Sequence, residues 1–160
     1  GVLVRVALVF SRRGYNIESL VVSPAYNASS TIAAFNPEPG EFSRMTITCS
    51  GNPEILEQIV KQLEKLIDVV HAIDHTGEAV IESEIALVKL QVGLKERTAI
   101  LQVAENFKAK VVDYATESVV LRCAGESDKI DALVSVLEPF GIVELVRSGK
   151  ILMARGLAAT

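Results

Sequence analysis

The stretch that decides the fold is residues 83–147, SEIALVKLQVGLKERTAILQVAENFKAKVVDYATESVVLRCAGESDKIDALVSVLEPFGIVELVR. Runs rich in Val, Ile and Leu, bounded by polar or glycine-containing turns, predict strands, while apolar residues at helical spacing predict helices. The expected strands are 83–92, 110–114, 118–124 and 142–147, and the expected helices are 96–108 and a segment that Ser127 caps and Pro139 and Gly141 end. The predicted order is therefore strand, helix, strand, strand, helix, strand.

This order is typical of the ferredoxin-like fold, an α+β arrangement in which two helices cover one face of an antiparallel sheet. Each predicted helix has an apolar stripe to bury. We expect these side chains to face the core: Ile100, Leu101, Ala104 and Phe107 in the first helix, and Ile130, Leu133, Val134 and Leu137 in the second.

The first half of the chain repeats the order without its first strand. A helix starting almost at Gly1, with Leu3, Val6, Ala7 and Phe10 at helical spacing, ends at Gly14. After it we predict strands at 16–23, 42–49 and 69–74, and a helix at 53–66 with Asn52 as its cap. We therefore expect two tandem ferredoxin-like domains, 1–76 and 77–160, joined near Thr76 and Gly77.

The first domain is expected to be incomplete at its amino terminus. In a ferredoxin-like sheet the first strand lies inside, so its loss leaves unpaired backbone groups on its neighbours. We expect that the native protein has residues before Gly1 and that residues 1–76 are poorly stable alone. The segment 25–41 is long for a connection, and loops of this length are usually functional or mobile.

Net charge, cysteine content and the lengths of the apolar runs exclude some classes of function. The chain of 160 residues has a net charge of −4, and both halves are mildly acidic, so nucleic acid is not expected as the main partner. Cys49 and Cys123 fall in separate predicted strands and are expected to be small buried side chains, which indicates a reducing compartment. We find no bilayer-spanning apolar run and no signal-peptide pattern.

The sequence contains no recognisable catalytic constellation. His71 and His75 lie four residues apart, but they fall at a predicted strand end and loop, and a shared metal is not implied. Ser29 and Ser30 have no nearby base, and the glycines match no phosphate-binding motif. These observations favour a binding or regulatory protein.

Five segments in order resemble one family. They are GVLVRVALVFSRRGYNIESL at 1–20, SRMTI at 43–47, LEQIVKQLEKLIDV at 56–69, ESEIALVKL at 82–90 and ELVRSGKILMARG at 144–156. Together they resemble the small regulatory subunit of acetohydroxyacid synthase, also called acetolactate synthase. The resemblance implies an amino-terminal ACT domain, which is an amino-acid-sensing variant of the ferredoxin-like fold, and a carboxy-terminal domain of related topology.

The resemblance also implies a function in the biosynthesis of valine, isoleucine and leucine. Such subunits dimerise through their ACT domains and bind a catalytic large subunit that carries thiamine diphosphate, Mg and FAD. They raise its activity and confer allosteric feedback inhibition by valine or a related branched-chain amino acid. This chain is then expected to be non-catalytic and without a cofactor or metal of its own. Its expected location is the bacterial cytoplasm or a plastid stroma.

The resemblance places an effector site at the ACT dimer interface. The matching positions are Gly1, Val2 and Leu3 at the helix start, and Asn16 and Ile17 at the start of the next strand. Backbone N–H groups at a helix start suit a carboxylate, an asparagine amide can bond an amino or carboxylate group, and apolar neighbours can receive a branched side chain.

Two alternatives remain open from the residues. The first is a free-standing ACT-type sensor that acts on another enzyme or on transcription, against which the lack of basic clustering argues. The second is a small enzyme on a ferredoxin-like scaffold, for which no nucleophile, base or anion-binding loop is found.

Overall fold

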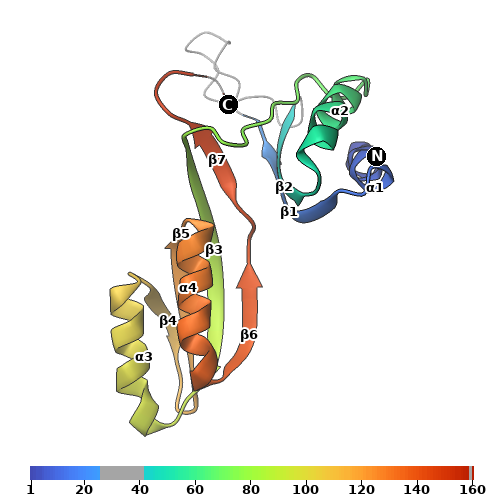
Figure 1. The fold of residues 1–160 in the computed structure, drawn as a ribbon. Helices are drawn as coiled ribbons and strands as arrows, with labels where there is room; N and C mark the ends of the chain where they lie inside the picture. Colours follow the sequence, from blue (N-terminus) through green and yellow to red (C-terminus); the bar gives the residue numbers. More distant parts are fainter. Residues whose placement is uncertain (26–41, 159) are drawn as a thin grey trace. The chain divides into compact units, whose positions relative to one another are not determined.

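The computed structural model describes residues 1–25, 42–158 and 160. The chain divides into two compact units, Gly1–Glu78 and Ala79–Thr160, which we call unit 1 and unit 2 (Figure 1). Both units combine helices with antiparallel sheet, so the fold is α+β, as predicted.

Unit 2 has the complete ferredoxin-like order. Its elements are β3 (Val80–Gln91), α3 (Leu94–Asn106), β4 (Lys110–Tyr114), β5 (Ser118–Gly125), α4 (Ser127–Leu137), a short 3-10 turn (Glu138–Phe140), β6 (Ile142–Arg147) and β7 (Ile151–Ala154). The strands pair antiparallel in the order β4-β5-β3-β6, which places the first strand of the unit inside the sheet. Gly141 has φ +92°, the left-handed backbone that ends the second helical segment.

The core of unit 2 lies between the sheet and its helices. Helices α3 and α4 lie on the same face of the sheet (Figure 1). The buried side chains alternate along β3 and β5 and recur at helical spacing, and they are Ala86, Val88, Leu90, Val92, Ile100, Ala104, Val119, Leu121, Cys123, Ile130, Leu133 and Leu137. The predicted inward stripe of α4 is confirmed, since Val134 also packs against this cluster.

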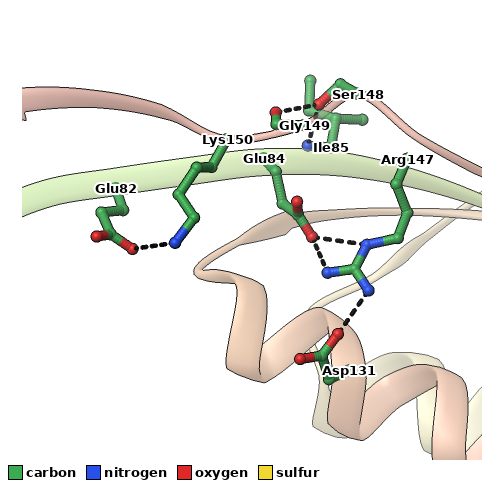
Figure 2. Close-up of polar contacts among 8 residues, drawn as sticks. All are labelled: Glu82, Glu84, Ile85, Asp131, Arg147, Ser148, Gly149 and Lys150. Carbon is green, nitrogen blue, oxygen red and sulfur yellow. Dashed lines mark hydrogen bonds and ion pairs between the residues drawn. The ribbon is translucent and has the colours of Figure 1, made fainter. Parts of the chain in front are cut away.

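Strand β3 changes partner along its length. Its residues 86–90 pair with β6, while its first residues, 80–83, pair with β7, a strand in a tail for which we predicted no structure. Figure 2 shows the polar contacts at this change of partner. The Ile85 N–H donates to Ser148 Oγ at 3.0 Å, and the Ser148 N–H donates to the Ile85 carbonyl at 2.9 Å.

Unit 1 contains α1 (Val2–Arg12), β1 (Asn16–Pro24), β2 (Ser43–Ser50) and α2 (Pro53–Glu64). Strands β1 and β2 form a two-stranded antiparallel sheet. Gly14 has φ +69°, as expected after a helix end, and Asn52 Oδ1 accepts a hydrogen bond from the Glu54 N–H at 3.0 Å, as a cap does. Its buried core is Val6, Phe10, Tyr15, Ile59 and Leu63.

The predicted strand at 69–74 is wrong. In unit 2, β6 pairs with β3, the first strand of that unit. Among the described residues unit 1 holds no counterpart of β3, so residues 69–74 have no backbone partner beside them and form no strand. Ala72 still packs against the unit 1 core, so the segment lies against the unit without joining its sheet.

Two finer predictions also differ from the structure. Ser127 does not cap α4: Glu126 holds the cap position, and no side chain bonds the helix start. On α1, Val2, Val6, Val9 and Phe10 face the core, whereas Leu3 is 44% exposed. We predicted a functional or mobile loop at 25–41. Apart from Ala25, it lies outside the residues that the structure describes.

Candidate functional site

A hollow lies in unit 1 where α1 ends and β1 begins. It is open to solvent and has a volume of about 510 Å³. Its lining mixes small, apolar and amide side chains: Ala7, Phe10, Ser11, Gly14, Tyr15, Asn16 and Ile17. The hollow is shallow, and its lining offers both apolar contact and polar groups, among them the Asn16 amide.

Tyr15 connects this hollow to the start of α2. The side chain is 7% exposed, and its hydroxyl donates a hydrogen bond to the Asn52 carbonyl. The ring lies against Gly51, where an added Cβ would be 2.6 Å from the nearest ring carbon. A side chain at position 51 would therefore overlap the Tyr15 ring, which explains why this residue is glycine.

Two groups in and beside the core of unit 1 have raised pKa values. Burial raises the pKa of the Cys49 thiol, and the nearby carboxylates of Asp74 and Glu18 raise it further. Burial, followed by Cys49 and Asp74, also raises the pKa of the Tyr15 hydroxyl. Burial is the first cause of both shifts, and the neighbouring acidic groups add to it.

The five predicted effector-binding residues fall in two places. Asn16 is exposed and Ile17 half-buried, and both line the hollow. Gly1, Val2 and Leu3 lie at the other end of α1, which at 11 residues is about 16 Å long. One copy of the chain therefore does not bring the two groups together around a single amino acid.

Helix α1 carries an exposed apolar surface. Of its residues, the sequence analysis had placed only Leu3 in the apolar stripe of the helix. Leu3, Val4 and Leu8 are 44%, 60% and 43% exposed, while Val6 and Phe10 of the same helix are buried. A helix that is apolar on all sides is usually buried on all sides. The near absence of charge between Val2 and Phe10 was the available signal, because only Arg5 interrupts that run.

No metal-binding cluster is found among residues 1–25, 42–158 and 160. Within them, no three His, Cys, Asp or Glu side chains gather as metal ligands would. His75 instead pairs with Glu78, with Nδ1 2.7 Å from Oε2. In the same described part of the chain, no helix is long and apolar enough to cross a membrane.

Unit 2 holds two buried charged side chains, and both have structural partners. Arg97 is 5% exposed; its guanidinium lies 4.5 Å from the centroid of the Tyr114 ring and donates to the Thr116 carbonyl at 2.5 Å. Glu84 is 6% exposed and accepts from Arg147 Nε at 2.9 Å. These contacts fix a helix and a strand in place and form no open site.

Family models match both units. Residues 1–71 match the AHAS small subunit-like ACT domain, and residues 83–156 match the small subunit of acetolactate synthase. The two matches together cover most of the chain, in the order that the sequence resemblance predicted.

Individual relatives agree along nearly the whole length. The chain is 41% identical over 156 residues to the acetolactate synthase small subunit of Mycobacterium bovis, covering 98% of this chain and 86% of that protein. It is 36% identical to a probable acetolactate synthase small subunit of Archaeoglobus fulgidus, covering 98% and 90%.

A solved structure shows the same fold. The crystal structure of an acetolactate synthase small subunit from Thermotoga maritima matches with a TM-score of 0.81 and 31% identity, covering 99% of this chain and 91% of that one. With the family models and the full-length relatives, this similarity confirms the predicted fold and resemblance. The chain belongs to the family of acetolactate synthase small subunits.

Proposed function

We propose that this chain is the regulatory subunit of an acetolactate synthase. It binds the catalytic large subunit, raises that subunit's activity and makes it sensitive to valine or a related branched-chain amino acid. The relationship to proteins named as small subunits along nearly the whole chain carries this proposal. Thiamine diphosphate, Mg and FAD would belong to the catalytic partner, and this chain would perform no catalysis itself.

The effector site is built from two copies of the chain. The exposed apolar surface of α1, centred on Val4 and Leu8, suits packing against the same surface of a second copy. A two-fold axis perpendicular to the two α1 helices places them antiparallel. The start of each α1 then lies beside the end of the other, because α1 is about as long as the separation between the two groups of predicted residues.

This pairing unites the two halves of the site twice per dimer. Gly1, Val2 and Leu3 of one copy approach the hollow that holds Asn16 and Ile17 of the other. The N–H groups at the start of α1 would bind the effector carboxylate. The Asn16 amide would bind its ammonium group, and Ile17 its branched side chain.

A complementation experiment tests the shared site. Leu3→Glu places a negative charge beside the carboxylate position, and Asn16→Ala removes the amide, so each variant alone should lose binding of L-valine, L-isoleucine and L-leucine in calorimetric titrations. Co-expression of the two variants should restore one intact site in each mixed dimer, made from the unaltered half of each copy. Absence of any restored binding in mixed dimers that sedimentation shows to have formed would place the site within one chain and refute the arrangement.

A second variant separates assembly from direct contact. Leu8 does not line the hollow, yet Leu8→Lys should abolish effector binding because the charge separates the two α1 helices. Val22 on β1 has a similar exposure, 47%, and Val22→Lys is the matched control that should leave binding unchanged. Equal effector binding by Leu8→Lys and Val22→Lys would argue against a site that depends on α1 pairing.

Reconstitution tests the function itself. Adding the chain to the purified catalytic subunit of the same organism should raise acetolactate formation, and adding L-valine, or in turn L-isoleucine and L-leucine, should then lower it. Linkage requires that effector binding and catalytic-subunit binding alter each other's affinity by the same factor. A chain that binds effector but changes neither the rate nor its inhibition would be a free-standing sensor instead.

A further inference from the structure

The start of β1 is held by only a short piece of the unit 1 sheet. Asn16 and Ile17 form the first two pairs of the ladder between β1 and β2. The ladder then shifts register, because Glu18 is an extra residue of β1, which makes a β-bulge. The bulge interrupts the pairing between these two residues and the rest of the strand. Their orientation therefore depends on what fixes the chain just before Asn16.

Tyr15 fixes the chain at that point. Its N–H donates to the Phe10 carbonyl at 3.1 Å, which holds its backbone against the end of α1. Its side chain is buried, and three carbons of its ring lie 2.6–2.9 Å from the place that a Cβ of Gly51 would take. A ring in such close contact with backbone has little freedom to turn.

The hydroxyl of Tyr15 is bonded to an acceptor that is itself fixed. It donates to the Asn52 carbonyl, and the same carbonyl accepts the Ile55 N–H at 3.0 Å in the first turn of α2. The ring lines the hollow, but the hydroxyl proton is engaged by this carbonyl. The hydroxyl therefore acts on a ligand in the hollow through the residues that Tyr15 holds in place.

We propose that Tyr15 is a positioning residue of the effector site, whose hydroxyl bond to the Asn52 carbonyl holds the Asn16 amide in the orientation that binds the effector. The inference rests on the proposed function, in which this amide binds the effector's ammonium group. A strand end beyond a bulge samples several orientations unless a further contact selects one. Selection before binding lowers the entropy that the ligand must otherwise offset.

Calorimetric titration of the full chain tests this role with Tyr15→Phe. The variant keeps the ring and its contact with Gly51 and loses only the hydroxyl. The dissociation constant should rise roughly three- to tenfold, the equivalent of one hydrogen bond, for whichever of L-valine, L-isoleucine and L-leucine the wild type binds. Tyr114 is an exposed residue of β4 in unit 2, and Tyr114→Phe is the matched control that should leave the constant unchanged.

Asn52→Ala separates positioning from loss of stability. It removes the side-chain oxygen that accepts the Glu54 N–H at the start of α2, so unit 1 becomes less stable, but it keeps the carbonyl to which Tyr15 bonds. Hydrogen exchange of the β2 amides measures the stability that each variant loses. Asn52→Ala should bind the effector as the wild type does. Equal losses of affinity at equal losses of stability would make Tyr15 a structural residue only and overturn the proposal.

The side-chain amide of Asn16 reports its positioning directly. In NMR spectra of the ¹⁵N-labelled full chain, its pair of signals is identified by its absence in Asn16→Ala. In Tyr15→Phe this pair should move toward the chemical shifts of a freely turning amide, while the backbone signals of β2 keep their positions. An unchanged Asn16 pair would overturn the proposal. Displaced β2 signals would also overturn it, because the hydroxyl would then hold the sheet and not the site.

The wild-type titration separates this proposal from the function on which it rests. If the wild type binds one of the three amino acids and Tyr15→Phe binds it equally well, only the role of Tyr15 is refuted. If the wild type binds none of them, the effector site itself is refuted, and the role of Tyr15 with it.

Discussion

At the scale of single residues, Tyr15 is the side chain that joins the candidate site to its scaffold. It stands just before Asn16, packs its ring on Gly51 and bonds the Asn52 carbonyl. The start of β1 and the start of α2 are thereby fixed to one another. This contact therefore fixes the positions of Asn16 and Ile17. In the sequence, Tyr15 stands out only as an apolar residue after a glycine.

Gly51→Ala should destabilise unit 1 by about 1–3 kcal/mol, because the new methyl group would overlap the ring of a buried tyrosine that has little room to move. Hydrogen exchange of β1 and β2 at increasing urea measures this loss. Gly93→Ala is the control: no atom lies within 4 Å of its added Cβ, and it lies in unit 2. Equal protection of the β1 amides from hydrogen exchange in the wild type and in Gly51→Ala would show that the Tyr15 ring can move aside.

At the scale of elements, the change of partner along β3 depends on a polar cluster (Figure 2). Arg147, the last residue of β6, binds Glu84 of β3 and Asp131 of α4, the latter at 2.5 Å. Lys150 approaches Glu82 at 3.4 Å just before β7 begins. These contacts hold the short segment between β6 and β7, so that β7 continues in the direction of β6 and pairs with the start of β3.

Arg147→Met should cost unit 2 about 3 kcal/mol, since it leaves the Glu84 carboxylate, 5% exposed, without its cationic partner. Asp131 is 60% exposed, so Asp131→Asn should cost at most about 0.5 kcal/mol. Urea unfolding compares the two variants, and hydrogen exchange should show faster exchange across Ile151–Ala154 in Arg147→Met only. A loss of similar size in both would mean that the buried pair contributes no more than the exposed one.

At the scale of the whole molecule, the two units differ in how fully their sheets are paired. Unit 2 has a five-stranded sheet and twelve buried residues in one cluster, whereas the described part of unit 1 has two strands and five buried residues. Less buried apolar surface gives a smaller free energy of unfolding. The unit that carries the candidate effector site is therefore the one that a bound ligand or a second copy can stabilise most visibly.

Unit 1 should open before unit 2 as urea increases, with its amides exchanging at lower concentration by mass-spectrometric hydrogen exchange. An effector at about 100 times its dissociation constant should raise the stability of unit 1 by about 2.7 kcal/mol and leave unit 2 unchanged. Simultaneous opening of the two units, with or without effector, would contradict both expectations.

The candidate site shows what the sequence could name and what it could not. Asn16 and Ile17, which only the family resemblance singled out, line a hollow. Phe10, Ser11 and Tyr15 were not predicted to join them, because their contact depends on how α1 folds back on β1 and not on spacing along the chain. The effector role of all five predicted residues stays a prediction.

By itself, the sequence determined the type and order of most elements. The bounds of β4 and β6 were predicted to the residue, and the Asn52 cap and the left-handed glycines 14 and 141 follow from local chemistry. Local periodicity and capping depend on neighbouring residues, which the sequence contains. Only the tertiary structure decided that β7 pairs with β3, that residues 69–74 form no strand, and which side of α1 is buried, because backbone partners and buried faces are set by segments far away in the chain.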